Sequence, residues 1–350
     1  MIIDFNNFNK FMNLLDSPVR HIGAHVNLHD DSSGEDVAAV IFRDTDALKE
    51  FTVERIGDDS KFFGFGICHK VNVKLRDMER AISVNTSNSL SIAMGDDNSF
   101  QRIRCFPTFK VDEVRRDENT NELSITAYDR LYKASKHYTS ELGIGDVQLF
   151  ALGTQYTIYD MVVAIAEFLG VSYQIPSDIP SFNRWYDEGA NLEGSELMRD
   201  VLDDIAEATQ TIYYLNRQNT LVFKRLDRDG AAVFGIDRNR YFNLDSKTNR
   251  RITGVCHVTE LGDNVLAQSN QTGTIQYVRD NPFWDLREDI DEIVTEALES
   301  VVGMTFNQFE CNWRGNFLLE VGDKLALHTK DGDIVYAYLV NDTLEYNGAL

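Results

Sequence analysis

Alternation of apolar and polar residues is the strongest local signal in the first 135 residues of the chain. The run FFGFGICHKVNVKL places apolar side chains at alternate positions: Phe63, Phe65, Ile67, Val71, Val73 and Leu75. This period is typical of a β-strand with one buried face. The glycines within the run indicate a bulge or a close approach of backbones. The runs FPTFKVDEV and ELSITAY flank the polar stretch RRDENTNE, which predicts a hairpin. A β-barrel or β-sandwich is therefore predicted for this region.

Two helices are predicted in the middle of the chain, where the apolar period becomes that of a helix. The run TIYDMVVAIAEFLG has Thr157 as a candidate N-cap, Asp160 three residues later as in a capping box, and Gly170 at the end. The run SELMRDVLDDIAEAT has Ser195 as its candidate cap. Acidic residues on this helix fall opposite the apolar stripe, which predicts a solvated face.

Strands return after the second helix. QTIYYL and TLVFKRL predict a hairpin, and GDKLALHTKDGDIVYAYLV predicts another about the turn at 330–332. Between them, NPFWDLREDIDEIVTEALESVVG predicts a helix with Asp285 as N-cap and Gly303 at its end. The order β, α, β, α, β lacks the regular alternation of a nucleotide-binding βαβ fold.

The charge balance excludes some classes of protein. Lys and Arg total 34 and Asp and Glu total 56, which gives a net charge of −22. Binding to nucleic-acid phosphates needs clustered cations, so this composition argues against a nucleic-acid-binding protein. Met1 is followed by IIDFNNFNKF, which has no basic and apolar regions of a secretory signal, and no apolar run is long enough for a membrane-spanning helix. Four cysteines far apart in sequence predict reduced thiols in a cytoplasm.

The stretch HIGAHVNLHDD contains the one candidate metal site. His21, His25 and His29 are spaced four residues apart, and on a helix the first two could share an ion. On a strand, which Gly23 and Val26 favour, residues four apart are separated by about 13 Å, too far for one ion. We therefore expect no metal here and keep the three histidines as a weak alternative.

No catalytic residue and no cofactor are predicted. The acidic runs DRDG and KDGD resemble parts of a calcium loop, but neither has the full ligand pattern, and both are expected to be turns. No nucleophile motif and no glycine-rich phosphate loop occur. Tyr128 and Asp129 end a predicted strand in SITAYDRLYKASKHY. They could be an active-site pair, but we expect a structural joint in which they satisfy backbone groups freed at the strand end.

Read in order, these segments resemble the hub proteins of phage tail baseplates, a family that includes the N-terminal region of siphophage tail-associated (Tal, prophage endopeptidase tail) proteins. The resemblance extends from about Lys49 to the end. FFGFGICHKVNVKL is similar to the glycine-containing strand of the first barrel, and LSITAYDRLYKASKHY to its exit. The remaining matches are similar to the helical insertion, the returning hairpin and the terminal strands: TIYDMVVAIAEFLGV, LMRDVLDDIAEATQTIYYLNRQNTLVFKRL and LEVGDKLALHTKDGDIVYAYLVNDTLEYNGAL.

The resemblance implies a β-rich α+β fold with two similar antiparallel β-barrel domains and helical insertions. The implied division is a first barrel at 1–133 plus 210–226, an α/β insertion at 134–209, a second barrel at 227–281 plus 304–350, and a helical insertion at 282–303. Three chains would form a pseudo-sixfold ring at the tail tip. The implied partners are the distal tail or tail tube protein, the tape measure protein and a fibre, spike or receptor-binding protein.

In this interpretation the chain is a non-enzymatic virion protein, assembled in the cytoplasm of the host bacterium. Because the chain stops at Leu350, just after the hub pattern, peptidase or lysin activity is expected on another chain. DNA would pass a channel without specific binding, since three copies carry 3 × −22 = −66 formal charges. Two alternatives remain open: a cell-wall hydrolase using acids such as Asp129 or those near Trp185, and a carbohydrate-binding module using the aromatic residues of SFNRWYDE.

Overall fold

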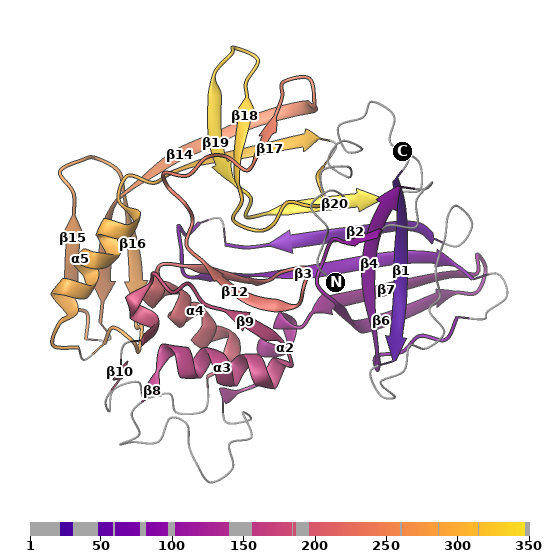
Figure 1. The fold of residues 1–350 in the computed structure, drawn as a ribbon, viewed down its shortest axis with the longest axis horizontal. Coiled ribbons are helices and arrows are strands. Elements are labelled where there is room, and N and C mark those ends of the chain that lie inside the picture. Colours follow the sequence, from indigo (N-terminus) through magenta and orange to yellow (C-terminus); the bar gives the residue numbers. More distant parts are fainter. Residues whose placement is uncertain are drawn as a thin grey trace, which may run out of the picture.

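A computed structural model shows a β-rich α+β protein with few helices and several sheets (Figure 1). This confirms the β-rich α+β part of the predicted fold class. The structure describes residues 22–30, 48–58, 60–77, 82–96, 102–139, 156–183, 185–186, 196–259, 261–285, 287–313 and 315–346.

The largest sheet contains 11 strands and is built mainly from the N-terminal part of the chain. Its main path runs β1-β4-β6-β7-β3-β11-β12-β9. These strands are β1 (Ile22–Asp30), β4 (Asn88–Asp96), β6 (Phe109–Asp117), β7 (Glu122–Asp129), β3 (Phe65–Arg76), β11 (Ile212–Leu215), β12 (Thr220–Lys224) and β9 (Ser172–Gln174). Three strands lie off this path: β5 (Arg102–Arg104) beside β4, and β2 (Leu48–Ile56) between β3 and β20 (Asp342–Tyr346). The last strand of the chain thus pairs with β2 near its beginning.

The C-terminal part of the chain forms two smaller sheets. The first contains β15 (Asn264–Gln268), β14 (Tyr241–Val258), β16 (Thr274–Arg279) and β17 (Thr305–Trp313), and the second β13 (Phe234–Ile236), β18 (Lys324–His328) and β19 (Ile334–Tyr338). The β11–β12 and β18–β19 hairpins occur where the sequence predicts them. A two-stranded sheet joins β8 (Tyr156–Thr157) to β10 (Trp185–Tyr186).

In the described ranges, the helix at 158–169 begins and ends at its sequence signals, whereas the helices at 198–209 and 290–301 begin later than the sequence predicts. The helices are α2 (Leu131–Ala134), α3 (Ile158–Leu169), α4 (Met198–Thr209), α5 (Ile290–Val301) and the 3₁₀ helix η2 (Pro180–Asn183). The predicted capping box of α3 is confirmed, because the Thr157 side chain accepts from the Asp160 N–H and the Asp160 carboxylate accepts from the Thr157 N–H. Gly170 closes α3 with φ +66°, a left-handed conformation that glycine adopts without strain. The prediction that Ser195 caps α4 is wrong, because the N-cap of this helix is Leu197, which makes no side-chain cap.

The prediction that Asp285 caps α5 is wrong. The helix begins at Ile290, and the residue before it, Asp289, makes no side-chain cap. Asp285 ends a turn in which the Asn281 side chain accepts from the Phe283 N–H at 3.0 Å. The Asp285 carboxylate lies 2.9 Å from His257 Nε2. Phe283 and Trp284 are buried in this turn, so their burial holds the segment out of the helix.

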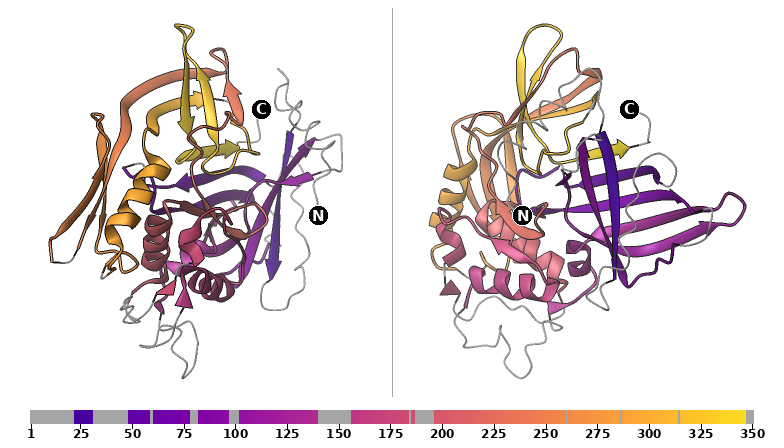
Figure 2. Two further views of the ribbon diagram at one scale, coloured as in Figure 1. Left: turned by 60° about the vertical axis from the view of Figure 1, so that its left-hand side comes forward. Right: turned by 45° about the vertical axis from the view of Figure 1, so that its right-hand side comes forward.

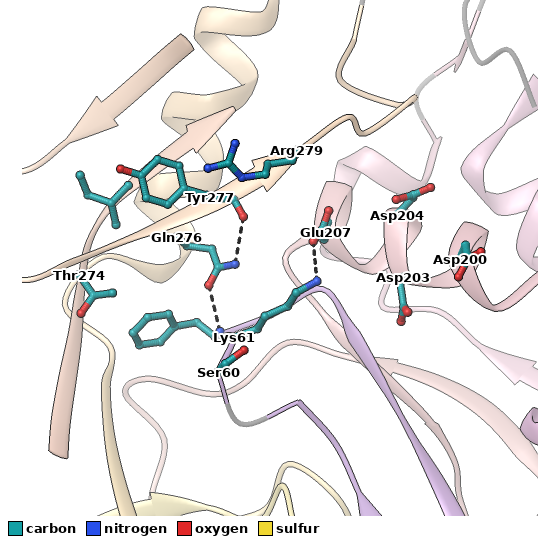
Figure 3. A pocket seen from close by; sticks show the side chains of 12 residues that line it. Ser60, Lys61, Asp200, Asp203, Asp204, Glu207, Thr274, Gln276, Tyr277 and Arg279 are labelled. Carbon is teal, nitrogen blue, oxygen red and sulfur yellow. Dashed lines mark hydrogen bonds and ion pairs between the residues drawn. The ribbon is translucent and has the colours of Figure 1, made fainter. Parts of the chain in front are cut away.

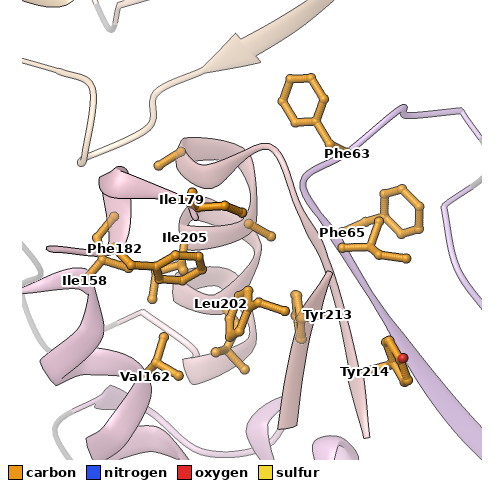
Figure 4. Close-up of a cluster of buried hydrophobic side chains, with 14 of the residues drawn as sticks. Phe63, Phe65, Ile158, Val162, Ile179, Phe182, Leu202, Ile205, Tyr213 and Tyr214 are labelled. Carbon is orange, nitrogen blue, oxygen red and sulfur yellow. The ribbon is translucent and has the colours of Figure 1, made fainter. Parts of the chain in front are cut away.

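Three hydrophobic cores organise the described part of the chain. One fills the N-terminal strands, and another lies among β13, β18 and the neighbouring strands. The largest joins α3, α4 and α5 to the β11–β12 hairpin and to β14. Figure 4 shows the part of this core where Val162 of α3, Leu202 of α4 and Tyr213 of β11 lie. The two views in Figure 2 show α3 and α4 at the base of the molecule, between the N-terminal strands and the β14–β16 sheet. The helical segment therefore connects the two β-rich parts by packing against both.

The sheets of the described residues do not close into a barrel. The two-barrel arrangement and the division into domains remain predictions. The separate cores of the N-terminal and C-terminal strands are compatible with two β-rich units, while the β2–β20 pairing links the end of the chain to the first unit.

Candidate functional site

Asp129, the acid at the end of β7, is almost fully buried, with 1% of its surface exposed. Its Oδ2 accepts from the His69 N–H at 2.8 Å and lies 2.7 Å from His69 Nδ1, while Oδ1 accepts from the Leu131 N–H at 3.0 Å. The position of His69 Nδ1 fits donation of a hydrogen bond to this carboxylate. The carboxylate thus satisfies backbone donors on β3 and at the start of α2. This is the structural joint that the sequence predicts.

Tyr128, the other residue of the predicted joint, has a different role. Its ring stacks on that of Tyr132 with centroids 4.1 Å apart. The stack joins the end of β7 to α2 on the surface, beside the buried carboxylate. Because Asp129 is buried and its carboxylate accepts from protein donors, this acid is not accessible to an external substrate.

A second buried polar cluster lies next to the joint, where the C-terminal segment crosses the N-terminal sheet. Arg55, only 4% exposed, donates from Nε and Nη2 to Asp342 at 2.5 Å each and from Nη1 to the Leu319 carbonyl at 2.6 Å. Arg217 donates to Glu320 at 2.7 Å. A buried arginine needs such a complete set of acceptors. These contacts fasten residues 319–342 to β2 and to the β11–β12 hairpin.

An open cavity of about 540 Å³ lies between α4 and β16 (Figure 3). One wall is acidic: Asp200, Asp203, Asp204 and Glu207 lie on one face of α4. The opposite wall contains Ile275, Gln276, Tyr277 and Arg279 of β16, and the segment 60–62 forms the floor. This differs from the predicted solvated acidic face, because β16 and the segment before β3 cover that face of α4. Glu207 is only 7% exposed.

Burial changes the titration of these acids. Desolvation, reinforced by the neighbouring carboxylates of Glu207, Asp203 and Asp200, raises the pKa of Asp204 to about 8. Burial also raises the pKa values of Asp203 and Glu207. Sequence analysis missed this cavity, since the spacing of acids along α4 is the same as on an exposed helix.

The predicted histidine cluster is only partly described. His25 and His29 lie on β1, and His29 Nε2 lies 3.1 Å from Ser91 Oγ of the neighbouring β4. His21 lies outside the described residues. Within the described ranges no group of three or more His, Cys, Asp or Glu side chains could hold a metal ion. The weak metal alternative of the three histidines stays a prediction.

The remaining sequence candidates are turns or lie outside the described side chains. The DRDG stretch is a turn in which Asp227 Oδ1 accepts from the N–H groups of Asp229 and Gly230. The KDGD stretch is the turn between β18 and β19, with Gly332 at φ +94°. Trp185 and Tyr186 form β10, and nothing is described of their side chains. The carbohydrate-binding alternative stays a prediction.

Similarity to known proteins is found at the level of the structure and not at the level of the sequence. No protein-family model matches the sequence, and no curated protein does. Solved structures match over nearly their full length, and three of them are named here. They are a tail protein from Neisseria meningitidis (TM-score 0.57, 11% identity, 92% of each chain), the prophage tail protein gp18 from Listeria monocytogenes (0.52, 13%, 91% of this chain and 90% of that one) and the 43 kDa tail protein of prophage MuSo2 from Shewanella oneidensis (0.53, 10%, 93% of each).

The chain has the fold of phage and prophage tail proteins. The matches cover 91–93% of this chain. At 10–13% identity, the fold is what the proteins share. No helix in the described parts of this tail-protein fold has the length and apolar character needed to cross a membrane.

Proposed function

We propose that the chain is a structural hub protein at the tail tip or baseplate of a phage, a prophage or a phage-tail-like particle. Three copies form a pseudo-sixfold ring around the DNA channel. The observation that carries this proposal is the tail-protein fold, which extends over at least nine-tenths of this chain and of each of three tail proteins. The buried joint at Asp129 supports a structural role over a catalytic one, since its carboxylate is fully used by His69 and Leu131.

A trimer gives sixfold geometry if each chain contributes two similar β-rich units. The separate hydrophobic cores of the N-terminal strands and of the β13–β19 region support such units. We place their boundaries as the sequence implies: 1–133 plus 210–226 and 227–281 plus 304–350, with insertions at 134–209 and 282–303. The β2–β20 pairing then ties the second unit to the first within one chain.

The ring lies between partners of different symmetry. In this proposal its sixfold face binds the distal tail or tail tube protein, the tape measure protein ends at the ring, and its threefold face carries a fibre, spike or receptor-binding protein. A trimer has 3 × −22 = −66 formal charges, so acids on the channel wall repel DNA phosphates and allow the genome to slide.

Native mass spectrometry of the purified chain tests the trimer. The expected species has a mass of 3 × 39.9 = 119.7 kDa and becomes more abundant as the protein concentration rises. A species of 39.9 kDa at every concentration, or a dimer, would count against the proposed ring.

A further inference from the structure

Two half-buried arginines, Arg104 and Arg130, lie close together at one end of the N-terminal sheet. Arg104 ends β5, and Arg130 lies between β7 and α2. The Thr108 hydroxyl accepts from Arg104 Nη2, and the next residue, Phe109, is opposite Asp129 in the β6–β7 pair, so both arginines lie beside this strand pair. Burial and the positive charge of Arg130 lower the pKa of Arg104, as expected for neighbouring cations.

Backbone and hydroxyl groups hold both guanidinium groups in place. Arg104 Nε donates to the Phe106 carbonyl at 3.1 Å, and Arg104 Nη2 donates to the Thr108 hydroxyl. Arg130 Nη1 donates to the Gly170 carbonyl at 2.5 Å, at the end of α3. These acceptors are neutral, so they orient the two cations and leave both charges uncompensated.

Neither arginine forms an ion pair with a carboxylate among the residues that the structure describes. Arg55 and Arg217, by contrast, each bind a carboxylate. A guanidinium has five N–H donors, and Arg104 Nη1 and Arg130 Nη2 have no acceptor within the described ranges. Two like charges held together destabilise each other, and an oxyanion that accepts from both would remove this repulsion. The pair therefore has the chemistry of an anion-binding site.

The chain itself presents the complementary charge on the outer surface of α5. The apolar residues of this helix are buried against β14 and β15, and α5 contains no lysine or arginine. Its exposed acids are Asp291, Glu292, Glu296 and Glu299. Figure 1 shows α5 beside the β14–β16 sheet and α2 beside the N-terminal strands. One copy can therefore offer these acids to the arginines of another.

We propose that Arg104 and Arg130 bind a carboxylate of α5 from a neighbouring copy of this chain. The contact joins two different surfaces, so it is heterologous, and a heterologous contact that closes produces a ring. Three such contacts hold the ring together, and the identity of the occupant as a ring neighbour rests on the proposed function. Each copy has a net charge of −22, so copies repel one another unless oppositely charged surfaces meet. Charge complementarity between the arginine pair and α5 argues for this occupant.

A phosphate group is the other oxyanion that fits two guanidinium groups, because arginine recognises phosphate and carboxylate with the same donors. DNA in the proposed channel is the nearest source of phosphate, but a genome that slides through a ring should not be held there. The chain has 56 acidic and 34 basic residues, so each neighbouring copy supplies carboxylates in excess. The carboxylate of a second copy is therefore the favoured ligand, and DNA binding is an outcome of the test.

Charge reversal on the full chain tests the contact, with the trimer measured by native mass spectrometry. Arg104→Glu with Arg130→Glu should weaken trimer formation at least tenfold, because the acids of α5 then meet acids. Glu292→Lys with Glu299→Lys should weaken it similarly, because the arginines then meet lysines. All four substitutions together should restore trimer formation to within about threefold of the unchanged chain, since the opposite charges meet again.

Two further variants separate this contact from net charge and from folding. Glu118 and Asp331 are exposed acids in the β6–β7 and β18–β19 turns. The reversed arginines give a net charge of −22 − 4 = −26, and adding Glu118→Lys with Asp331→Lys returns it to −22, but this control should restore no trimer. Arg104→Gln with Arg130→Gln introduces no repulsion and should weaken the trimer several-fold, while its far-UV circular dichroism stays that of the unchanged chain.

The proposal is overturned if the trimer persists in both double charge-reversal variants, or if the four substitutions restore no more trimer than the control does. Saturable binding of a labelled DNA duplex that Arg104→Glu with Arg130→Glu abolishes would assign the site to phosphate instead. In each of these cases, a trimer of the unchanged chain leaves the proposed ring intact. An unchanged chain that never forms a trimer would contradict the ring itself, and the contact with it.

Discussion

The Asp129 carboxylate joins two segments that are distant in sequence, β3 through His69 and α2 through Leu131. Replacing Asp129 with alanine leaves two buried N–H groups and the His69 ring without their acceptor. Each unsatisfied buried donor costs about 1–3 kcal/mol, so Asp129→Ala should lower the free energy of unfolding by roughly 3 kcal/mol or more in a urea titration. The exposed Asp112, which pairs with Lys136 at the surface, is the matched control, and Asp112→Ala should have little effect. Full stability of Asp129→Ala would contradict the structural role.

The sequence predicts this joint only in part. A polar residue at a strand end signals that backbone groups need partners, and that signal is local to SITAYDRLY. His69 lies 60 residues earlier and comes next to Asp129 only because β3 pairs with β7. No local pattern encodes that pairing, so the histidine could not be named in advance.

At the scale of elements, β3 and β11 pair closely because residue 66 has no side chain. A Cβ built on Gly66 would lie 2.2 Å from Cζ of the Tyr213 ring, and Tyr213 is opposite Gly66 in the parallel β3–β11 pair. Gly66→Ala should therefore lower the free energy of unfolding by about 2 kcal/mol or more, measured by chemical denaturation. Gly235 is the control, since a Cβ there meets nothing nearer than 3.8 Å, and Gly235→Ala should be tolerated. Equal stability of the two variants would mean that the close approach is unimportant.

The acidic face of α4 makes the stability of the molecule depend on pH. Because the pKa of Asp204 is raised to about 8 in the folded state, the folded protein holds a proton that the unfolded chain loses above about pH 4. The free energy of unfolding should therefore fall as the pH rises from 4 to 8. Asp204→Asn should reduce that fall and stabilise the protein by roughly 2 kcal/mol at pH 8, with no gain near pH 4. Asp263→Asn should keep the unchanged slope, and an identical slope in both variants would refute the assignment to Asp204.

Periodicity predicts elements better than it predicts their neighbours. The strand at β3, the hairpins and the capping box of α3 all follow from local residue patterns. The start of α5 and the burial of the α4 acids do not, since each depends on contacts with remote segments: Asp285 with His257, and Glu207 with Lys61. A polar helix face has the same sequence pattern whether solvent or another element covers it, so the pattern alone predicts a solvated face.

At the scale of the whole molecule, the last strand returns to the first sheet. β20 pairs with β2, and the buried Arg55–Asp342 ion pair spans 287 positions of sequence. The C-terminal β-rich part is therefore tied to the N-terminal one by a strand, a buried ion pair and the large core around α3, α4 and α5. Such a rigid connection suits a ring component, in which two units of one chain must keep fixed positions around a common axis.

Cryo-electron microscopy of assembled tails that contain this chain tests the central claim most directly. We predict three copies at the tail tip, arranged as a ring of six β-rich units around the channel, with a sixfold tail protein on one side. Six or more copies along the tail shaft, or copies placed away from the channel, would contradict the proposed hub.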